Sequence, residues 1–103
     1  MSAPASDDPA KSPGAVTRIL KIVNEKGLHA RASAKFVQLV EKFDAQVMVS
    51  RNGDSAGGDS IMGLMMLAAG IGTSISVSAT GPQAQDVIAA LDQLVSSRFG
   101  EEE

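Results

Sequence analysis

The sequence predicts an α+β fold, an open-faced two-layer sandwich with a four-stranded antiparallel sheet and three helices on one of its faces. The spacing of apolar residues alternates between a two-residue and a three-to-four-residue period, which predicts elements in the order β-α-β-β-α-β-α. The strands alternate apolar and polar residues, so only one sheet face is apolar and the helices must all lie on it. A chain of 103 residues has room for one such domain.

The first strand and the first helix are predicted from two adjacent patterns. Residues 17–23 alternate, with Leu20 and Ile22 on one side and Lys21 on the other, as in a strand with one solvated face. Residues 30–43 repeat apolar positions at helical spacing, which predicts an amphipathic helix. Its apolar face comprises Ala32, Phe36, Leu39, Val40 and Phe43, and its outward face comprises Lys35, Gln38 and Glu41.

A hairpin is predicted next. Residues 45–51 form a strand, and Asn52-Gly53 is a strong turn signal because both central positions of such a turn need positive φ. The returning strand, residues 54–58, is rich in glycine, which predicts an irregular, poorly paired edge.

The last part of the chain is predicted to hold two helices and one strand. Residues 60–69 form a short helix that ends at Gly70 and Gly72. Residues 74–80 alternate apolar residues with serines, as in a strand. Pro82 suits the first turn of the final helix. That helix has a buried stripe of Val87, Ile88, Leu91, Leu94 and Val95.

Composition excludes several classes of function. Without cysteine, the chain has no disulfides, thiol nucleophiles or cysteine-based metal sites. The net charge is -3, but residues 17–100 hold eight Lys or Arg against seven Asp or Glu, with no basic cluster. Neither Tyr nor Trp is present for base stacking, so nucleic acid is a poor candidate partner.

The ends of the chain differ from its middle. Residues 1–16 mix Pro, Ser, Ala and Asp without an apolar run, which predicts a disordered N-terminal arm and no signal peptide or membrane span. Residues 17–100 are the predicted domain, and residues 101–103 are an acidic tail. We expect a soluble, cytoplasmic monomer with no insertion into a membrane.

The candidate reactive residue is His29, the only histidine. It follows a polar turn, residues 24–27, and directly precedes the first predicted helix. Helix N-termini disfavour positive charge and attract anions, so this position favours a neutral, nucleophilic imidazole and stabilises a phosphoryl group once it is attached. Arg31 carries a guanidinium that matches phosphate oxygens. The pattern alone also fits a histidine that merely caps the helix, with an unrelated arginine.

Two motifs decide between these interpretations. GLHARASAKFV, residues 27–37, and DSIMGLMMLAAG, residues 59–70, resemble the HPr family, the histidine-containing phosphocarriers of the phosphoenolpyruvate-dependent phosphotransferase system. The resemblance runs from Thr17 to Phe99. It implies that His29 accepts a phosphoryl group from enzyme I and passes it to an enzyme IIA-type acceptor, while Arg31 stabilises the phosphate. Many relatives have proline where this chain has Ala32.

The resemblance also implies a stoichiometric carrier, without metal or cofactor, and a role for the second motif. Ser60 suits the N-cap of the second helix. In the HPr proteins of many bacteria this serine is a regulatory phosphorylation site, so the resemblance implies an HPr serine kinase as a further partner, although the sequence does not tell whether the source organism has one. Six apolar residues surround the helix, and we expect about half in the core and the rest exposed near His29 as a docking surface. The predicted docking residues are Ile61, Met62 and Met65.

Two other functions remain open on the sequence. One is a regulatory binding module controlled at Ser60, for which His29 would be dispensable. The other is a small phosphatase with a histidine nucleophile, which the lack of an evident general acid disfavours. Within the carrier interpretation, the sequence does not separate sugar uptake from a nitrogen-related regulatory branch.

Overall fold

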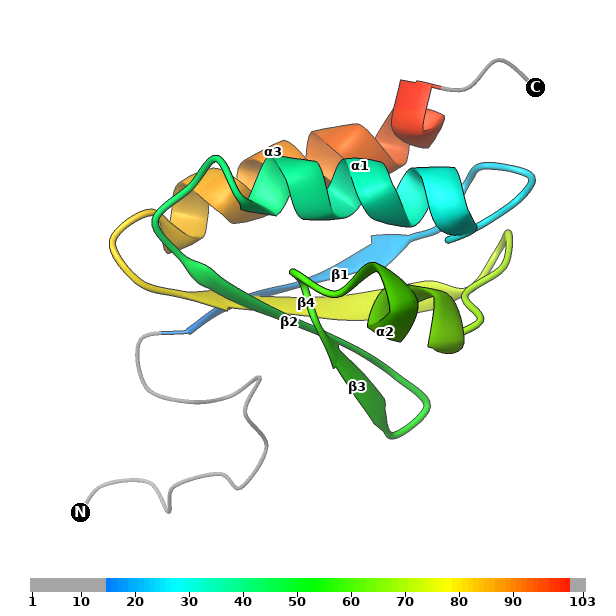
Figure 1. The fold of residues 1–103 in the computed structure, drawn as a ribbon, viewed down its shortest axis with the longest axis horizontal. Helices are drawn as coiled ribbons and strands as arrows, with labels where there is room; N and C mark the ends of the chain where they lie inside the picture. The colour runs from blue at the N-terminus through cyan, green and yellow to red at the C-terminus, as the bar shows by residue number, and fades with distance from the viewer. Residues whose placement is uncertain (1–14, 101–103) are drawn as a thin grey trace.

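The computed structural model describes residues 15–100, and its strands form one sheet (Figure 1). The strand order is β1-β4-β2-β3, and every neighbouring pair is antiparallel. The strands are β1 (Val16–Lys21), β2 (Gln46–Arg51), β3 (Asp54–Gly57) and β4 (Ser74–Thr80). The helices are α1 (Ala30–Val40), α2 (Ile61–Met66) and α3 (Ala84–Ser96), followed by a short 3-10 turn, η2 (Arg98–Gly100). The predicted fold class and element order are confirmed.

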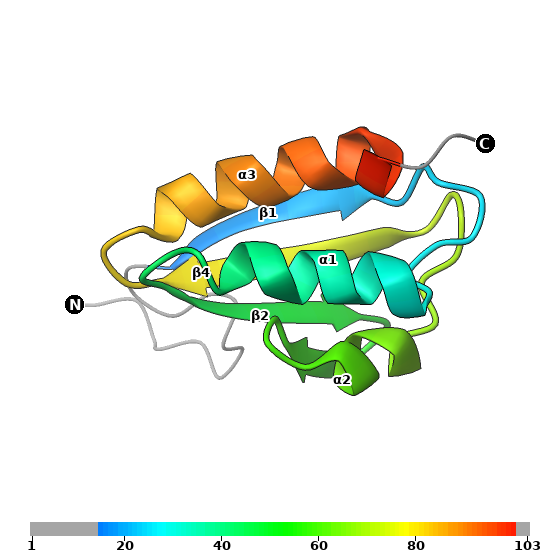
Figure 2. The ribbon, with the colours of Figure 1, turned by 45° about the horizontal axis from the view of Figure 1, so that its top comes forward.

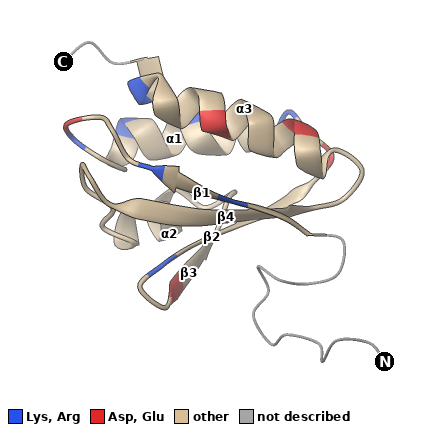
Figure 3. Cartoon of the chain, turned by 180° about the vertical axis from the view of Figure 1, so that it is seen from behind, with Lys and Arg blue, Asp and Glu red and all other residues tan. Residues whose placement is uncertain are grey.

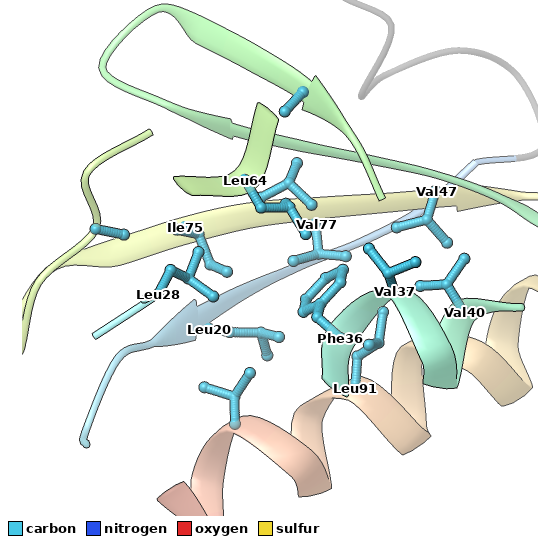
Figure 4. Packing of buried hydrophobic residues seen from close by; sticks show 14 of the residues in the cluster. Leu20, Leu28, Phe36, Val37, Val40, Val47, Leu64, Ile75, Val77 and Leu91 are labelled. Atoms are coloured by element: carbon cyan, nitrogen blue, oxygen red, sulfur yellow. The ribbon is translucent and has the colours of Figure 1, made fainter. Parts of the chain in front are cut away.

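The helices form a layer on one face of the sheet. Helices α1 and α3 lie side by side across it, and α2 lies beside α1 and β3 (Figures 1 and 2). The central strand β4 turns Ile75, Val77 and Ala79 toward the helices, as its alternation predicts. These side chains meet the buried side chains of α1 and α3, such as Phe36 and Leu91, in a single core (Figure 4).

The apolar face of α1 is close to the predicted one. Ala32, Phe36 and Val40 are buried, whereas Leu39 and Phe43 are only partly buried. The helix also buries Val37 and Ser33, which the sequence analysis did not assign to the core. Lys35, predicted to point outward, is partly buried, because its Nζ donates a 2.6 Å hydrogen bond to the Phe99 carbonyl oxygen.

The strand predictions need two corrections. Strand β1 begins at Val16, inside the predicted N-terminal arm, and ends at Lys21, two residues before the predicted end. Residues 1–14 and the tail at 101–103 lie outside the described residues. Strand β3 lies at the sheet edge as predicted, but it is regularly paired. Its residues match β2 in one register, from Arg51 opposite Asp54 to Met48 opposite Gly57.

The first two helices are shorter than predicted. Helix α1 ends at Val40, and tighter turns continue to Phe43. Helix α2 ends at Met66, and Ala68, with φ of 54°, turns the chain away before either predicted glycine. The reason is tertiary. The Leu67 carbonyl accepts a hydrogen bond from Arg51 Nη1, so a partner from another element occupies the end of the helix.

The start of α3 also differs. Gly81 and Pro82 form a turn outside the helix, which begins at Ala84. Two hydrogen bonds to the backbone of Asp44 hold Gln83 outside the helix. The Asp44 carbonyl oxygen accepts from the Gln83 backbone N–H at 3.0 Å, and the Asp44 backbone N–H donates to Gln83 Oε1 at 2.7 Å. Of the predicted stripe, only Leu94 is incompletely buried.

Candidate functional site

His29 is the N-cap residue of α1, at the position that the sequence predicts. Its backbone is extended, with φ of -78° and ψ of -176°, and its carbonyl accepts the first helical hydrogen bond from the Ser33 N–H at 2.9 Å. The imidazole takes the place that a serine or aspartate side chain often has, because His29 Nδ1 accepts from the Arg31 backbone N–H at 3.3 Å. The residue is only partly buried.

This contact concerns one of the two ring nitrogens, Nδ1. An imidazole nitrogen that accepts a hydrogen bond does so with its lone pair, so in this arrangement Nδ1 is the ring nitrogen without a proton. The Nδ1 lone pair points at the start of α1, where the first amides have no carbonyl partner within the helix. The site can therefore place an anion attached to Nδ1 against backbone N–H groups.

The turn before His29 is joined to the segment after α2. The Leu28 N–H donates to the Ala69 carbonyl at 3.0 Å, and the Gly72 N–H donates to the Ile22 carbonyl at 2.8 Å. Figure 1 shows the two loops at the same end of the molecule, beside the start of α1. The two sequence motifs thus come together in space.

Arg31 lies in the first turn of α1 and is exposed. Within residues 15–100 its guanidinium takes part in no ion pair, unlike Arg18, which pairs with Asp92 of α3 at 2.9 Å. Figure 3 shows that positively and negatively charged residues are scattered over several elements. Arg31 is therefore a positive group close in sequence to the imidazole, with no internal carboxylate partner in the described region.

Ser60 is the N-cap of α2, as predicted. Its backbone is extended, and its Oγ accepts from the Gly63 N–H at 3.0 Å. The Ser60 carbonyl also accepts from the Leu64 N–H at 3.0 Å. The side chain is partly buried at the start of a helix whose dipole favours negative charge.

The cap at Ser60 leads to a measurable stability difference. A Ser60→Ala variant is expected to lose about 1 kcal/mol of unfolding free energy, because the Gly63 amide loses its side-chain acceptor. Urea denaturation measures the loss, and Ser60→Asp, which retains an acceptor oxygen, should keep most of the stability. Equal losses in both variants would contradict the capping role.

Helix α2 presents most of its apolar side chains to solvent. Of the six apolar residues, only Leu64 and Leu67 are buried, which is fewer than the predicted half. Met62 and Met66 are 70% and 77% exposed. Ile61 and Met65, the other two of the six, are also exposed. Ile71, in the turn before β4, is a further exposed apolar residue, and the sequence did not predict it. We call Ile61, Met62, Met65 and Met66 the α2 surface.

Three residues of the site's framework were not predicted from the sequence. Gly27 has φ of 64°, and a Cβ there would overlap the Ala69 carbonyl oxygen. Asn24, in the turn, and Ser33, in α1, are fully buried polar residues. Asn24 and Gly27 could have been found from the polar turn in which they lie. Ser33 could have been found from its spacing, because a residue four positions after His29 lies on the same helix face.

The described region was also compared with the requirements of a membrane-spanning helix and of a metal site. None of its helices has the length and apolar content that a membrane span requires. Among residues 15–100, no three His, Asp or Glu side chains cluster in a way that could hold a metal ion.

Comparison with known proteins gives consistent results. The family model "PTS HPr component phosphorylation site" matches residues 16–97. The phosphocarrier protein HPr of Cupriavidus necator is 52% identical over 82 residues, which cover 80% of this chain and 92% of that protein. The phosphocarrier protein HPr of Pseudomonas aeruginosa is 46% identical over 85 residues, covering 82% and 94%.

Solved structures are similar over the same region. The crystal structure of HPr-C-His from Thermoanaerobacter tengcongensis superposes with a TM-score of 0.81 at 39% identity, covering 85% of this chain and 99% of that one. A phosphocarrier protein HPr from Bacillus anthracis has a TM-score of 0.75 at 33% identity, covering 79% and 96%.

Proposed function

This chain belongs to the HPr family and has a phosphocarrier role in the phosphotransferase system, and from this premise we propose that His29 is the residue that accepts the phosphoryl group. The observation that carries the proposal is the 3.3 Å contact between His29 Nδ1 and the Arg31 amide. It identifies a ring nitrogen with an available lone pair, on a partly exposed side chain, at the anion-binding end of a helix.

In the proposed step, the Nδ1 lone pair attacks the phosphorus of the donor. The N–P bond forms as the bond from phosphorus to the leaving group breaks, and the leaving group keeps that electron pair. The hydrogen bond from the Arg31 amide to Nδ1 is long, at 3.3 Å, so little free energy is lost when the bond to phosphorus takes its place. The phosphoryl oxygens then accept from the amides at the start of α1. Passing the group on reverses these steps.

Arg31 is proposed to stabilise the charge on the phosphoryl group. Its guanidinium has donors that match phosphate oxygens, and no ion pair within residues 15–100 competes for it. Phosphoryl transfer depends mainly on positioning and charge stabilisation, so these few groups are sufficient for a carrier. We propose that the chain is a stoichiometric carrier whose transfers are catalysed by its partners.

The proposed partners are a phosphoenolpyruvate-dependent enzyme I as donor and an enzyme IIA-type protein as acceptor. We propose that residues 17–100 act as one monomeric domain toward both, without metal or cofactor, and the cytoplasmic location remains a prediction. The α2 surface is the proposed docking surface, because it is apolar, mostly exposed and on the side of the molecule where the His29 turn meets the segment after α2. Flexible methionines suit a surface that contacts partners in succession.

The docking proposal predicts a specific kinetic effect. With a Met62→Lys variant as its substrate, enzyme I should show a KM about ten-fold higher and a kcat little changed, because a charge replaces apolar contact area while His29 is untouched. Steady-state phosphorylation assays measure both constants. The matched control is Ile19→Lys, at a 63% exposed residue of β1 that faces away from the helices. Equal effects of the two variants would exclude a special role for the α2 surface.

Ser60 is proposed as a regulatory phosphorylation site for an HPr serine kinase. A phosphate on Oγ would lie at the N-terminus of α2, where negative charge is tolerated, so it need not unfold the helix. It would instead add charge next to Ile61 and Met62 and weaken docking of enzyme I. If Ser60→Asp accepted phosphoryl groups at the unmodified rate, this mechanism would be contradicted.

The test of the carrier function uses the full chain with phosphoenolpyruvate and a general enzyme I. Mass measurement should show one added phosphoryl group, and acid should remove it, as expected for an N–P bond. Absence of uptake, or an acid-stable product, would overturn the proposal. Sustained phosphate release from a generic phosphate ester would instead support a phosphatase.

A further inference from the structure

The turn before His29 is held by two buried polar side chains. Within residues 15–100 the buried polar residues are Asn24, Ser33 and Ser78, and the first two have no exposed area at all. Burying a polar group costs free energy unless its hydrogen bonds are made, so such residues are retained where they hold a particular geometry. Both side chains bond to carbonyl groups of the turn that leads to His29.

Asn24 acts on the first of these carbonyls. Its Nδ2 donates to the Gly27 carbonyl oxygen at 2.9 Å. The same oxygen accepts from the His29 backbone N–H at 2.9 Å, and the Gly27 N–H donates back to the Asn24 carbonyl at 3.2 Å. One buried side chain therefore fixes the group that binds the backbone of His29 itself.

Ser33 acts on the next carbonyl. Its Oγ donates to the Leu28 carbonyl oxygen at 3.3 Å, from one turn inside α1. The N–H of Leu28 is bound to the Ala69 carbonyl at 3.0 Å. The N–H of Leu28 is thus held by Ala69 and its carbonyl by Ser33, and both partners lie outside the turn.

We propose that Asn24 and Ser33 are positioning residues for phosphoryl transfer. They hold the Gly27 and Leu28 carbonyls and thereby fix the backbone conformation that leads into His29. This conformation in turn fixes the direction in which Nδ1 faces the amides of α1. This inference rests on the proposed role of His29 as phosphoryl acceptor. A fixed direction matters because the reacting nitrogen, the phosphorus and the leaving group must lie in line, and small displacements are costly.

The test compares Asn24→Ala and Ser33→Ala with a matched control, Ser78→Ala. Ser78 is the third buried polar residue, and it lies on β4, away from the turn. The rate of phosphorylation by enzyme I and phosphoenolpyruvate is expected to fall about ten-fold for Asn24→Ala and about three-fold for Ser33→Ala, and to stay within about two-fold for Ser78→Ala. A second readout is the spontaneous loss of the phosphoryl group from each purified phosphoprotein, which needs no partner and should be faster only in the two turn variants.

The outcomes separate the two proposals. If the wild-type chain takes up no acid-labile phosphoryl group, the role of His29 is overturned, and the positioning role with it. If the wild type is phosphorylated but both turn variants behave like Ser78→Ala in rate and in phosphoryl loss, only the positioning role is overturned. Should Asn24→Ala fail to fold, Asn24→Leu serves in its place, because it keeps about the same size and has no donor for the Gly27 carbonyl.

Discussion

A His29→Asn variant is expected to lose phosphoryl uptake altogether, with a rate at least about 1,000-fold below that of the unchanged chain. An asparagine amide nitrogen has no lone pair available for attack on phosphorus, whereas the asparagine oxygen can still accept from the amides of α1. Asn is a favoured N-cap residue, so the fold should be retained. Mass measurement after incubation with phosphoenolpyruvate and enzyme I would show the loss.

Two controls give this result its meaning. Urea denaturation should show an unfolding free energy within about 0.5 kcal/mol of the unchanged chain, because the cap is preserved. Arg31→Ala keeps the nucleophile and should still reach one phosphoryl group per chain, but about ten-fold more slowly, since one charge-assisted contact is removed. Acid-labile phosphorylation of His29→Asn at the normal rate would show that another residue is the acceptor.

The largest expected loss of stability follows from Gly27→Ala. Gly27 has φ of 64°, a conformation that costs a residue with a Cβ about 1 kcal/mol or more. The new methyl group would also overlap the Ala69 carbonyl oxygen and the Gly70 Cα, both backbone atoms that cannot simply rotate away. Displacing them breaks the Leu28–Ala69 hydrogen bond, so we expect a total loss of about 4 kcal/mol.

Gly72→Ala is the matched control for this effect. Gly72 also has positive φ, of 85°, but a Cβ there would meet nothing within 4 Å. Its loss should be limited to the conformational cost, about 1 to 2 kcal/mol. Urea denaturation of both variants measures the difference. Similar losses would mean that contact between the His29 turn and the segment after α2 adds little to stability.

Much of the fold and of the candidate site could be predicted from local patterns. The alternation in residues 74–80 correctly predicts that Ile75, Val77 and Ala79 of β4 are buried, but Ser78, predicted to face outward, is buried as well. The turn at 24–27, followed by helical spacing, correctly predicts that His29 lies at the start of α1. Ser60 is likewise confirmed as an N-cap. Each of these features depends on residues within a few positions of one another.

Other features depended on contacts that local patterns do not contain. Arg51 binds the end of α2, and Asp44 holds Gln83 outside α3, so these helix boundaries were wrong in the sequence prediction. The exposure of Met62 and Met66 follows from the position of α2 beside β3 at the edge of the sheet.

The sequence by itself determined the order of elements, most of the apolar residues that face the core and the place of the histidine before a helix, because periodicity and turn composition act over short distances along the chain. Only the tertiary structure decided which segments meet around that histidine. Asn24, Ser33 and Ala69 each bind the turn at residues 27–28, and Ala69 comes from the distant segment after α2. Such bonds depend on how sheet and helices pack together, and spacing along the chain does not encode that packing in any simple way.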